Sequence, residues 1–256
     1  MQTGWVMHDD VELEFGVPVA GRILARECWT QTALKRYPDD RHLDWAELFG
    51  RSAPVVLDLG CGNGRYLIWS AVHRPEYDHL GVDTLPVVIR YARRRGNQRG
   101  LTNLKFAVGG GRELLSEHVA PASVTEVHCY HPQPYYDPSQ VHRRLITPEF
   151  LALVHRALVP GGLFVVQSDN PGYWRYIRAV VPVFFEFAEG RGSWPDNPRG
   201  RTRREIIARS KRLPVFHGTG RAKADLSSDD AVRLAADLPP PVFDADRRLR
   251  ALDRLE

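Results

Sequence analysis

The sequence predicts an α/β protein built on a doubly wound, mostly parallel sheet. Short apolar runs alternate with helical patterns along most of the chain. A glycine-rich turn joins the first apolar run to a helix, and polar motifs follow the later runs, where a parallel sheet gathers the carboxyl ends of its strands. The 256 residues, of which 43% are hydrophobic and 26% charged, allow one sizeable globular domain with extensions or two small domains.

The first strand is expected at 55–59, an apolar run that carries Asp58 near its end. A helix is expected at 66–73, and three glycines at alternate positions lie between the two elements. Glycine is needed where a chain turns with positive φ or where its backbone must approach a ligand closely. The turn glycines are Gly60, Gly62 and Gly64.

The spacing of this turn narrows the choice of ligand. It is not the Gly-x-Gly-x-x-Gly pattern of dinucleotide-binding turns, and no Lys-Ser or Lys-Thr follows to form a triphosphate-binding loop. Asp-x-Gly-x-Gly-x-Gly after a strand resembles the first motif of the class I S-adenosylmethionine (SAM) methyltransferases. The resemblance implies that the loop contacts the methionine part of SAM, with Asp58 beside it. An ordinary strand-to-helix turn that binds nothing is the alternative.

A second acid supports cofactor binding. The run 77–83 is expected to be the next strand and ends at Asp83, about one β-α-β unit after the glycine turn. A carboxylate at this interval is typical of one that holds ribose hydroxyl groups. The two features together predict a SAM site.

The remaining core elements continue the alternation. A helix is expected at 85–95, with Arg93–Arg95 at its negative end. The expected strands are 103–108, 124–130, 163–167 and 183–188, and the expected helices are 148–158 and 173–181.

The flanks differ from this core. We expect residues 1–50 to form an N-terminal helical arm, with a helix within 20–35, and residues 51–220 to form the methyltransferase domain. Residues 221–256 are expected to be a peripheral charged tail with a capped helix near 227–238. Segment 190–212 is expected to be a loop rich in arginine. It is either a phosphate-binding surface for nucleic acid or a solvated basic loop.

Composition excludes several classes of protein. The net charge of +4 is only modestly basic, and the three cysteines are too widely spaced for a disulfide framework or a zinc site. No apolar run approaches the roughly 18 residues of a membrane span, and the first residues have neither the basic nor the apolar region of a secretory signal. We therefore expect a cytoplasmic protein that binds neither metal nor membrane.

Longer motifs give a more specific resemblance. From about Leu43 to Gly218 the chain resembles the bacterial tRNA (guanine-N7-)-methyltransferases. It shares the entry to the first strand at Leu48–Pro54, the motif after the fourth strand at His131–Tyr135, and the following Arg-Arg and Pro-Glu-Phe. The resemblance implies tRNA as substrate and SAM as cofactor. It implies Gln133 and Asp169 as catalytic residues; Asp58, Gly60, Gly62, Gly64, Asp83 and Gly110 for SAM; and Asp137, Asp169, Arg201, Thr202, Arg203 and Glu205 for the substrate.

Three of these positions depart from the family pattern. Gln133 replaces the aspartate of the Pro-Asp-Pro motif, Gly110 replaces an acid on the adenine side, and Asp137 replaces a substrate-binding lysine. Guanine N7 is a lone pair without a proton, so transfer depends on positioning more than on a general base. Glutamine can still hydrogen-bond a base edge.

Some readings stay open at this point. Asp169 and Glu205 are candidate acceptors for the guanine N1–H and amine, although Asp169 could equally cap the next helix. The run Pro132–Tyr135 resembles the Asn-Pro-Pro-Tyr motif of enzymes that methylate exocyclic or side-chain amines and amides. A third reading is a relative that binds SAM and tRNA but has lost catalysis.

Overall fold

A seven-stranded sheet forms the centre of the molecule in the computed structural model, which describes residues 11–255. Its strand order is β5-β4-β3-β6-β7-β9-β8, and only β9 runs antiparallel to its neighbours. The expected doubly wound, mostly parallel sheet is confirmed. The strands are β3 (Val55–Leu59), β4 (Asp78–Asp83), β5 (Leu104–Val108), β6 (Val124–Tyr130), β7 (Leu158–Ser168), β8 (Phe185–Glu189) and β9 (Phe216–Ala222).

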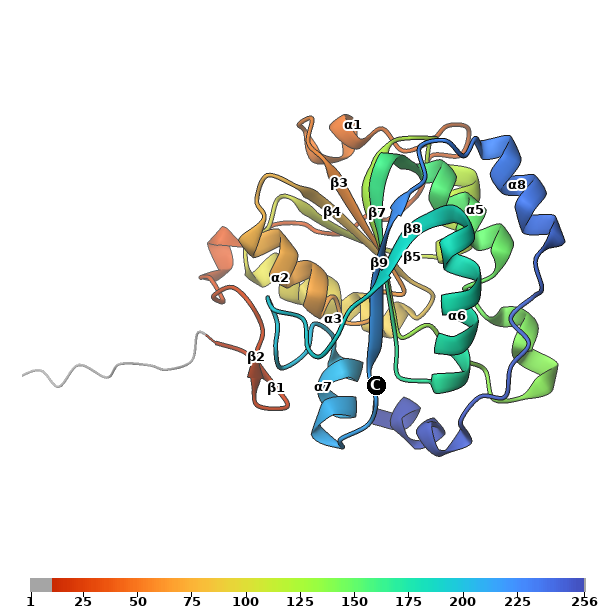
Figure 1. The fold of residues 1–256 in the computed structure, drawn as a ribbon. Helices are drawn as coiled ribbons and strands as arrows, with labels where there is room; N and C mark the ends of the chain where they lie inside the picture. The colour runs from red at the N-terminus through yellow and green to blue at the C-terminus, as the bar shows by residue number, and fades with distance from the viewer. Residues whose placement is uncertain (1–10, 256) are drawn as a thin grey trace, which may run out of the picture.

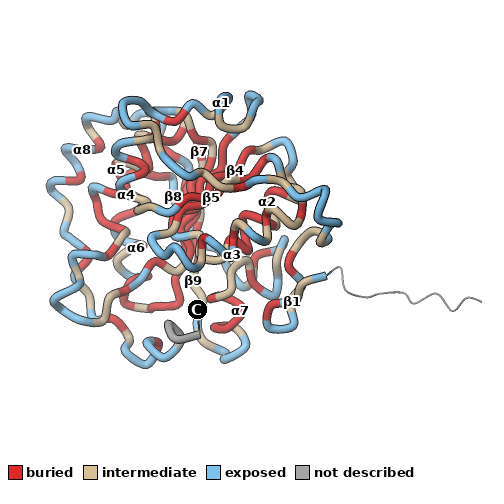
Figure 2. Tube along the Cα trace, turned by 180° about the vertical axis from the view of Figure 1, so that it is seen from behind, coloured by how far each residue is buried: buried red, intermediate tan, exposed pale blue. Residues whose placement is uncertain are grey.

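Helices cover both faces of this sheet (Figure 1). On one face lie α2 (Arg65–His73) and α3 (Pro86–Gln98), and on the other α5 (Pro148–Ala157) and α6 (Pro171–Phe184), with α8 (Ser228–Asp237) outside α5. Two buried apolar clusters, one on each face, account for this layering. The strands are accordingly the most buried part of the chain in Figure 2. Short turns α4 (Gly111–Glu113) and Leu114–His118 connect β5 to β6.

The segment before the sheet is not the helix expected at 20–35. It contains a two-stranded hairpin, β1 (Leu13–Glu14) and β2 (Val17–Pro18), then a 3₁₀ turn at Arg26–Cys28 and the short helix α1 (Trp45–Phe49). Backbone groups of 32–34 pair instead with Phe106 of β5. Covering this outer strand satisfies groups that a sheet edge leaves exposed, which explains the extended conformation.

The chain after β8 also differs from expectation. Residues 190–212 include the helix α7 (Arg203–Ser210), and residues 216–222 form β9, which lies between β7 and β8. Glycine is a weak strand former, so Gly218 and Gly220 obscured this strand in the sequence. A Cβ at Gly220 would lie 2.7 Å from Cβ of Phe185, so the bare backbone permits close packing.

The C-terminal segment continues past the sheet. Helix α8 is capped by Ser227, whose hydroxyl accepts from the backbone of Asp230 as the sequence predicts. A 3₁₀ helix, η4 (Arg247–Leu255), ends the described chain. Between residues 11 and 255, no helix combines the length and apolar character needed to span a bilayer.

Candidate cofactor and substrate site

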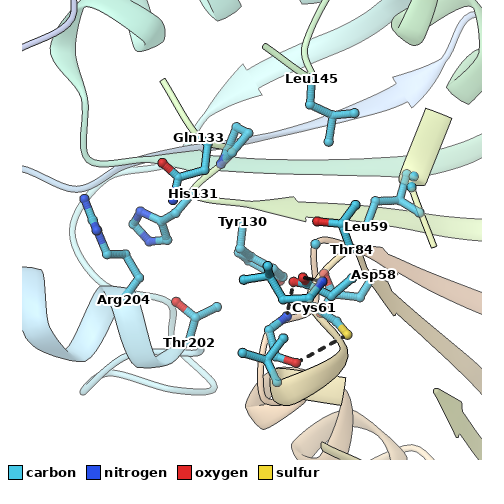
Figure 3. Close-up of a pocket in the computed structure, with 18 of the residues that line it drawn as sticks. Asp58, Leu59, Cys61, Thr84, Tyr130, His131, Gln133, Leu145, Thr202 and Arg204 are labelled. Atoms are coloured by element: carbon cyan, nitrogen blue, oxygen red, sulfur yellow. Dashed lines mark hydrogen bonds between the residues drawn. The ribbon is translucent and has the colours of Figure 1, made fainter. Parts of the chain in front are cut away.

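A cavity of about 540 Å³ opens at the carboxyl ends of β3, β4, β5 and β6 (Figure 3). One side is formed by the turn after β3 and the end of β4. The other side is formed by the segment after β6 and by the start of α7. The predicted residues that line it are Asp58, Gly60, Gly62, Asp83, Gly110, Gln133, Thr202 and Arg203.

The glycine turn is shaped by three left-handed residues. Gly60, Gly62 and Gly64 have φ of +83°, +53° and +75°. The backbone N–H groups of Gly60 and Cys61 donate to the carbonyl of Val82, which ties the turn to β4. Gly64 does not line the cavity. A Cβ there would lie 2.6 Å from the Phe106 ring, so this glycine lets α2 pack on the sheet.

Two acids face the cavity from neighbouring strands. Asp58 is buried, and its Oδ1 has no hydrogen-bond partner among residues 11–255. Burial, together with the charge of Asp83, raises the pKa of Asp58 well above its usual range. Asp83 accepts hydrogen bonds from the backbone N–H groups of Gly62 (3.0 Å) and Leu85 (2.9 Å). Burial raises the pKa of Asp83, and those two bonds oppose the rise.

Gly110, which follows β5, lines the cavity next to Glu113. A Cβ at this residue would lie 3.7 Å from Oε2 of Glu113, an ordinary contact distance. Glu113 therefore brings a carboxylate next to the position at which the resemblance implies an acid. No motif in the sequence points to this glutamate.

The segment after β6 is sharply bent. His131 and Tyr135 have positive φ of 49° and 42°, and Pro132 and Pro134 restrict the residues between them. This bend places Gln133 at the cavity, as Figure 3 shows.

Asp169 is buried and paired rather than open to the cavity. Its Oδ2 accepts from Arg204 Nε at 2.7 Å, and its Oδ1 lies 3.6 Å from His131 Nδ1. Burial alone would raise the pKa of Asp169, but His131 and Arg204 outweigh it and hold the pKa well below its usual range. The cap of α6 is Asn170, which accepts from the backbone of Gly172 and Tyr173, so Asp169 is not the helix cap.

A chain of hydrogen bonds determines which ring nitrogen of His131 carries the proton. The Trp194 indole can only donate, and it donates to Oε1 of Gln167 at 2.6 Å. The amide nitrogen of Gln167 therefore points at Nε2 of His131, 3.1 Å away, and that nitrogen must accept. The proton of neutral His131 is thus on Nδ1, which faces Asp169.

The start of α7 holds the remaining predicted residues. Thr202 caps the helix by accepting from the backbone of Glu205. Glu205 is fully buried and accepts from the backbone of Arg201 (2.8 Å) and from Arg209 Nε (2.7 Å). Arg203 lines the cavity and pairs with Glu14 at 3.3 Å.

Arg201 and Asp137 do not line the cavity. The Arg201 guanidinium lies 3.7 Å from the centre of the Trp194 ring, donates to the Tyr130 hydroxyl at 3.0 Å and pairs with Asp196. Its charge is directed into the protein. Asp137 is exposed at the start of the 3₁₀ helix η3 (Pro138–Arg143), where it accepts from Ser139.

Glu14 of the N-terminal hairpin is a buried residue that sequence reasoning missed. It accepts from Asn63 Nδ2 at 2.7 Å in the glycine turn and pairs with Arg65 and Arg203. The hairpin thereby joins the cofactor turn to α7. No sequence signal links these residues, because they are more than 45 positions apart.

Comparison with known proteins assigns the chain to a family. The model of a family described as "Putative methyltransferase" matches residues 52–217, well over half of the chain. The chain belongs to this methyltransferase family. The match covers β3 to the start of β9, and with them every residue of the cavity.

Relatives of this methyltransferase carry a common name. It is 34% identical over 153 residues to the tRNA (guanine-N(7)-)-methyltransferase of Arthrobacter sp. (strain FB24), covering 59% of this chain and 48% of that one. It is also 34% identical over 172 residues to that of Halorhodospira halophila (strain DSM 244 / SL1), covering 66% and 74%. The chain therefore spans about half the length of the first relative and about three quarters of the second.

A solved structure supports the fold. The 16S rRNA methyltransferase KamB superposes with a TM-score of 0.56 at 19% identity, covering 75% of this methyltransferase and 99% of KamB.

Among the described residues, no group of three or more His, Cys, Asp or Glu side chains is placed to hold a metal ion.

Proposed function

We propose that the protein transfers a methyl group from SAM to N7 of a guanine in tRNA. The observation that carries the proposal is one cavity in which the glycine turn and its two acids face the bent segment with Gln133. The relatives' names supply the substrate class.

The cofactor side of the cavity fits SAM. Positive-φ glycines leave backbone exposed to a ligand, and the unpartnered Oδ1 of Asp58 is an acceptor without a donor. We assign Asp58 and the turn to the methionine part, Asp83 to the ribose hydroxyls, and Glu113, beside Gly110, to the adenine side. When bound, SAM supplies an electrophilic methyl group on its sulfonium.

On the substrate side, Gln133 orients the base. Guanine N7 attacks through a lone pair, so no group has to remove a proton beforehand, and alignment is the main requirement. The carboxylates of Asp169 and Glu205 already accept from arginine side chains. We therefore assign to Asp169 the orientation of His131, and to Glu205 the stabilisation of α7. The Gln133 amide can hydrogen-bond a neutral base without burying a charge.

The surrounding parts complete the proposal. Residues 51–220 act as the methyltransferase domain, which β9 extends to Ala222. The preceding arm covers β5 and the glycine turn, and Arg203 meets tRNA phosphates at the cavity mouth. A tRNA substrate places the protein in the cytoplasm.

The test is methylation of bulk tRNA with labelled SAM, followed by nuclease digestion and identification of the labelled nucleoside. We expect 7-methylguanosine. Label on an exocyclic amine would instead support the Asn-Pro-Pro-Tyr-like reading of Pro132–Tyr135. Binding of SAM and tRNA without any product would identify a relative that has lost catalysis.

A further inference from the structure

The C-terminal segment Pro239–Leu255 lies next to the substrate side of the cavity. It follows α8 and lies beyond the residues matched by the methyltransferase family, which end at 217. In Figure 1 the end of the chain lies beside α7, far from α8. The segment therefore lies outside the matched residues and near the end of the sheet where the cavity opens.

Arg144, which lines the cavity, holds the middle of this segment. The side chain is 2% exposed and donates to carbonyls on both sides of it. Nε donates to Pro134 (2.6 Å) and Nη2 to Tyr135 (3.1 Å), both in the bent segment. Nη1 donates to Pro241 (2.5 Å), and the guanidinium lies 3.6 Å from the centre of the Phe243 ring. One arginine thus joins the segment that carries Gln133 to the C-terminal segment.

The end of the segment packs on α7. Leu249 of η4 is buried against Ile207, with Leu213 beside them. Because α7 begins at the cavity with Thr202 and Arg203, η4 is fixed relative to the site. The position of η4 therefore depends on packing at Leu249 and on the Arg144 hydrogen bonds.

Two exposed arginines of η4 lie near the rim. Arg247 and Arg250 are three residues apart, which places them on one face of a 3₁₀ helix with three residues per turn. Both are close enough to Asp137 to contribute to its lowered pKa, after the larger effect of its hydrogen bonds from Ser139. Asp137 caps η3, and His142 and Arg143 of η3 line the cavity, so η4 brings positive charge beside this part of the cavity wall.

We propose that Arg247 and Arg250 form a phosphate contact for RNA at the rim of the cavity, held there by Arg144 and Leu249. The proposal rests on the proposed tRNA substrate. Arginine suits a phosphate contact because its planar guanidinium matches phosphate oxygens.

The test measures affinity for bulk tRNA across a series of KCl concentrations. Arg247→Ala/Arg250→Ala should weaken binding and reduce the slope of log K against log salt by about 1.5–2, since each phosphate contact contributes about 0.7–0.9. SAM affinity should stay unchanged. The matched control is Arg221→Ala/Arg233→Ala, which removes two exposed charges from β9 and α8, away from the cavity. Phe243→Ala should reproduce part of the loss by loosening the segment, and Asp137→Lys should steepen the slope by about one.

The outcomes separate two failures. If the wild type methylates tRNA but the η4 double variant keeps its salt slope, or loses no more than the control, the phosphate contact is refuted and the proposed function stands. If the wild type neither binds nor methylates tRNA, both proposals fall together.

Discussion

Nε of Arg204 lies 2.7 Å from Oδ2 of Asp169, and both side chains are almost completely buried. The pair joins the segment after β7, which carries Asp169, to α7, which carries Arg204. Buried charges of this kind are costly when one partner is removed.

We predict that Arg204→Met destabilises the protein by about 3–5 kcal/mol in urea unfolding, because it leaves the Asp169 carboxylate without its cation. Arg204→Met combined with Asp169→Leu should recover most of that loss. Asp169 has a lowered pKa, so its contribution is present above the usual aspartate range and is lost as pH falls through the lowered pKa. Equal midpoints for the wild type and Arg204→Met would show that the pair contributes nothing.

The contribution of Asp58 to stability should depend on pH in the opposite direction from that of Asp169. Its pKa is raised in the folded state, so stability falls as pH rises from the unfolded value of about 4 toward the raised value. Asp58→Asn removes the titrating group at nearly constant shape. Thermal unfolding of the ligand-free protein should show that the variant becomes more stable relative to the wild type as the pH rises above about 4, the usual aspartate pKa. A stability difference that does not change with pH above this value would contradict the raised pKa of Asp58.

Asp83→Ala should weaken SAM binding by about ten- to a hundredfold, the effect of losing a hydrogen bond to a charged group. Part of the loss comes from the Gly62 N–H, which Asp83 holds in place. Because the pKa of Asp83 is raised, SAM affinity should fall as pH drops through it, at a higher pH than for an ordinary aspartate. Calorimetry measures both effects, and Asp83→Asn is the conservative control. Unchanged affinity in a folded Asp83→Ala protein would remove the ribose role.

On the proposed function, Gln133→Ala should lose much of its turnover on tRNA while SAM affinity is kept, because Gln133 belongs to the bent segment that faces the glycine turn across the cavity. Gln133→Asp should be tolerated or faster, since the motif that this segment resembles has aspartate at this position. Single-turnover rates with saturating SAM provide the measurement. An inactive wild type whose activity returns in Gln133→Asp would mark Gln133 as a lesion.

The sequence predicted the parts of the fold in which apolar runs and turn signals agree. Strand β3 and strand β6 occur at the expected residues, and Asp83 ends β4 as expected. Strand β9 was missed because two glycines, which pack against phenylalanines of β8, replace the usual β-branched residues. Close packing of this kind depends on which strand lies alongside, and a local pattern carries no information about that.

The candidate site was predicted in part for a similar reason. Motif positions predicted that the glycine turn and Gln133 would lie at one site, and both line the same cavity because the carboxyl ends of parallel strands converge. They could not show that Arg201 points inward at Trp194 and Tyr130. Its neighbour Arg203, with the same charge in the same sequence context, reaches the cavity. Arg201 precedes α7 whereas Arg203 is its first residue, and each side chain follows its partners: Trp194, Tyr130 and Asp196 for Arg201, and Glu14 for Arg203.

The place of β9 also affects how the chain is made. The strand lies between β7 and β8, and β8 is bonded to the sheet through β9. Before residues 216–222 have been synthesised and have left the ribosome, the edge of β7 therefore has unpaired backbone groups. The β8 segment has no strand to pair with at this stage. Open edges of incomplete chains readily pair with other molecules. The nascent protein thus remains prone to aggregation until β9 pairs with β7 and β8. A chain truncated after α7 should therefore be insoluble.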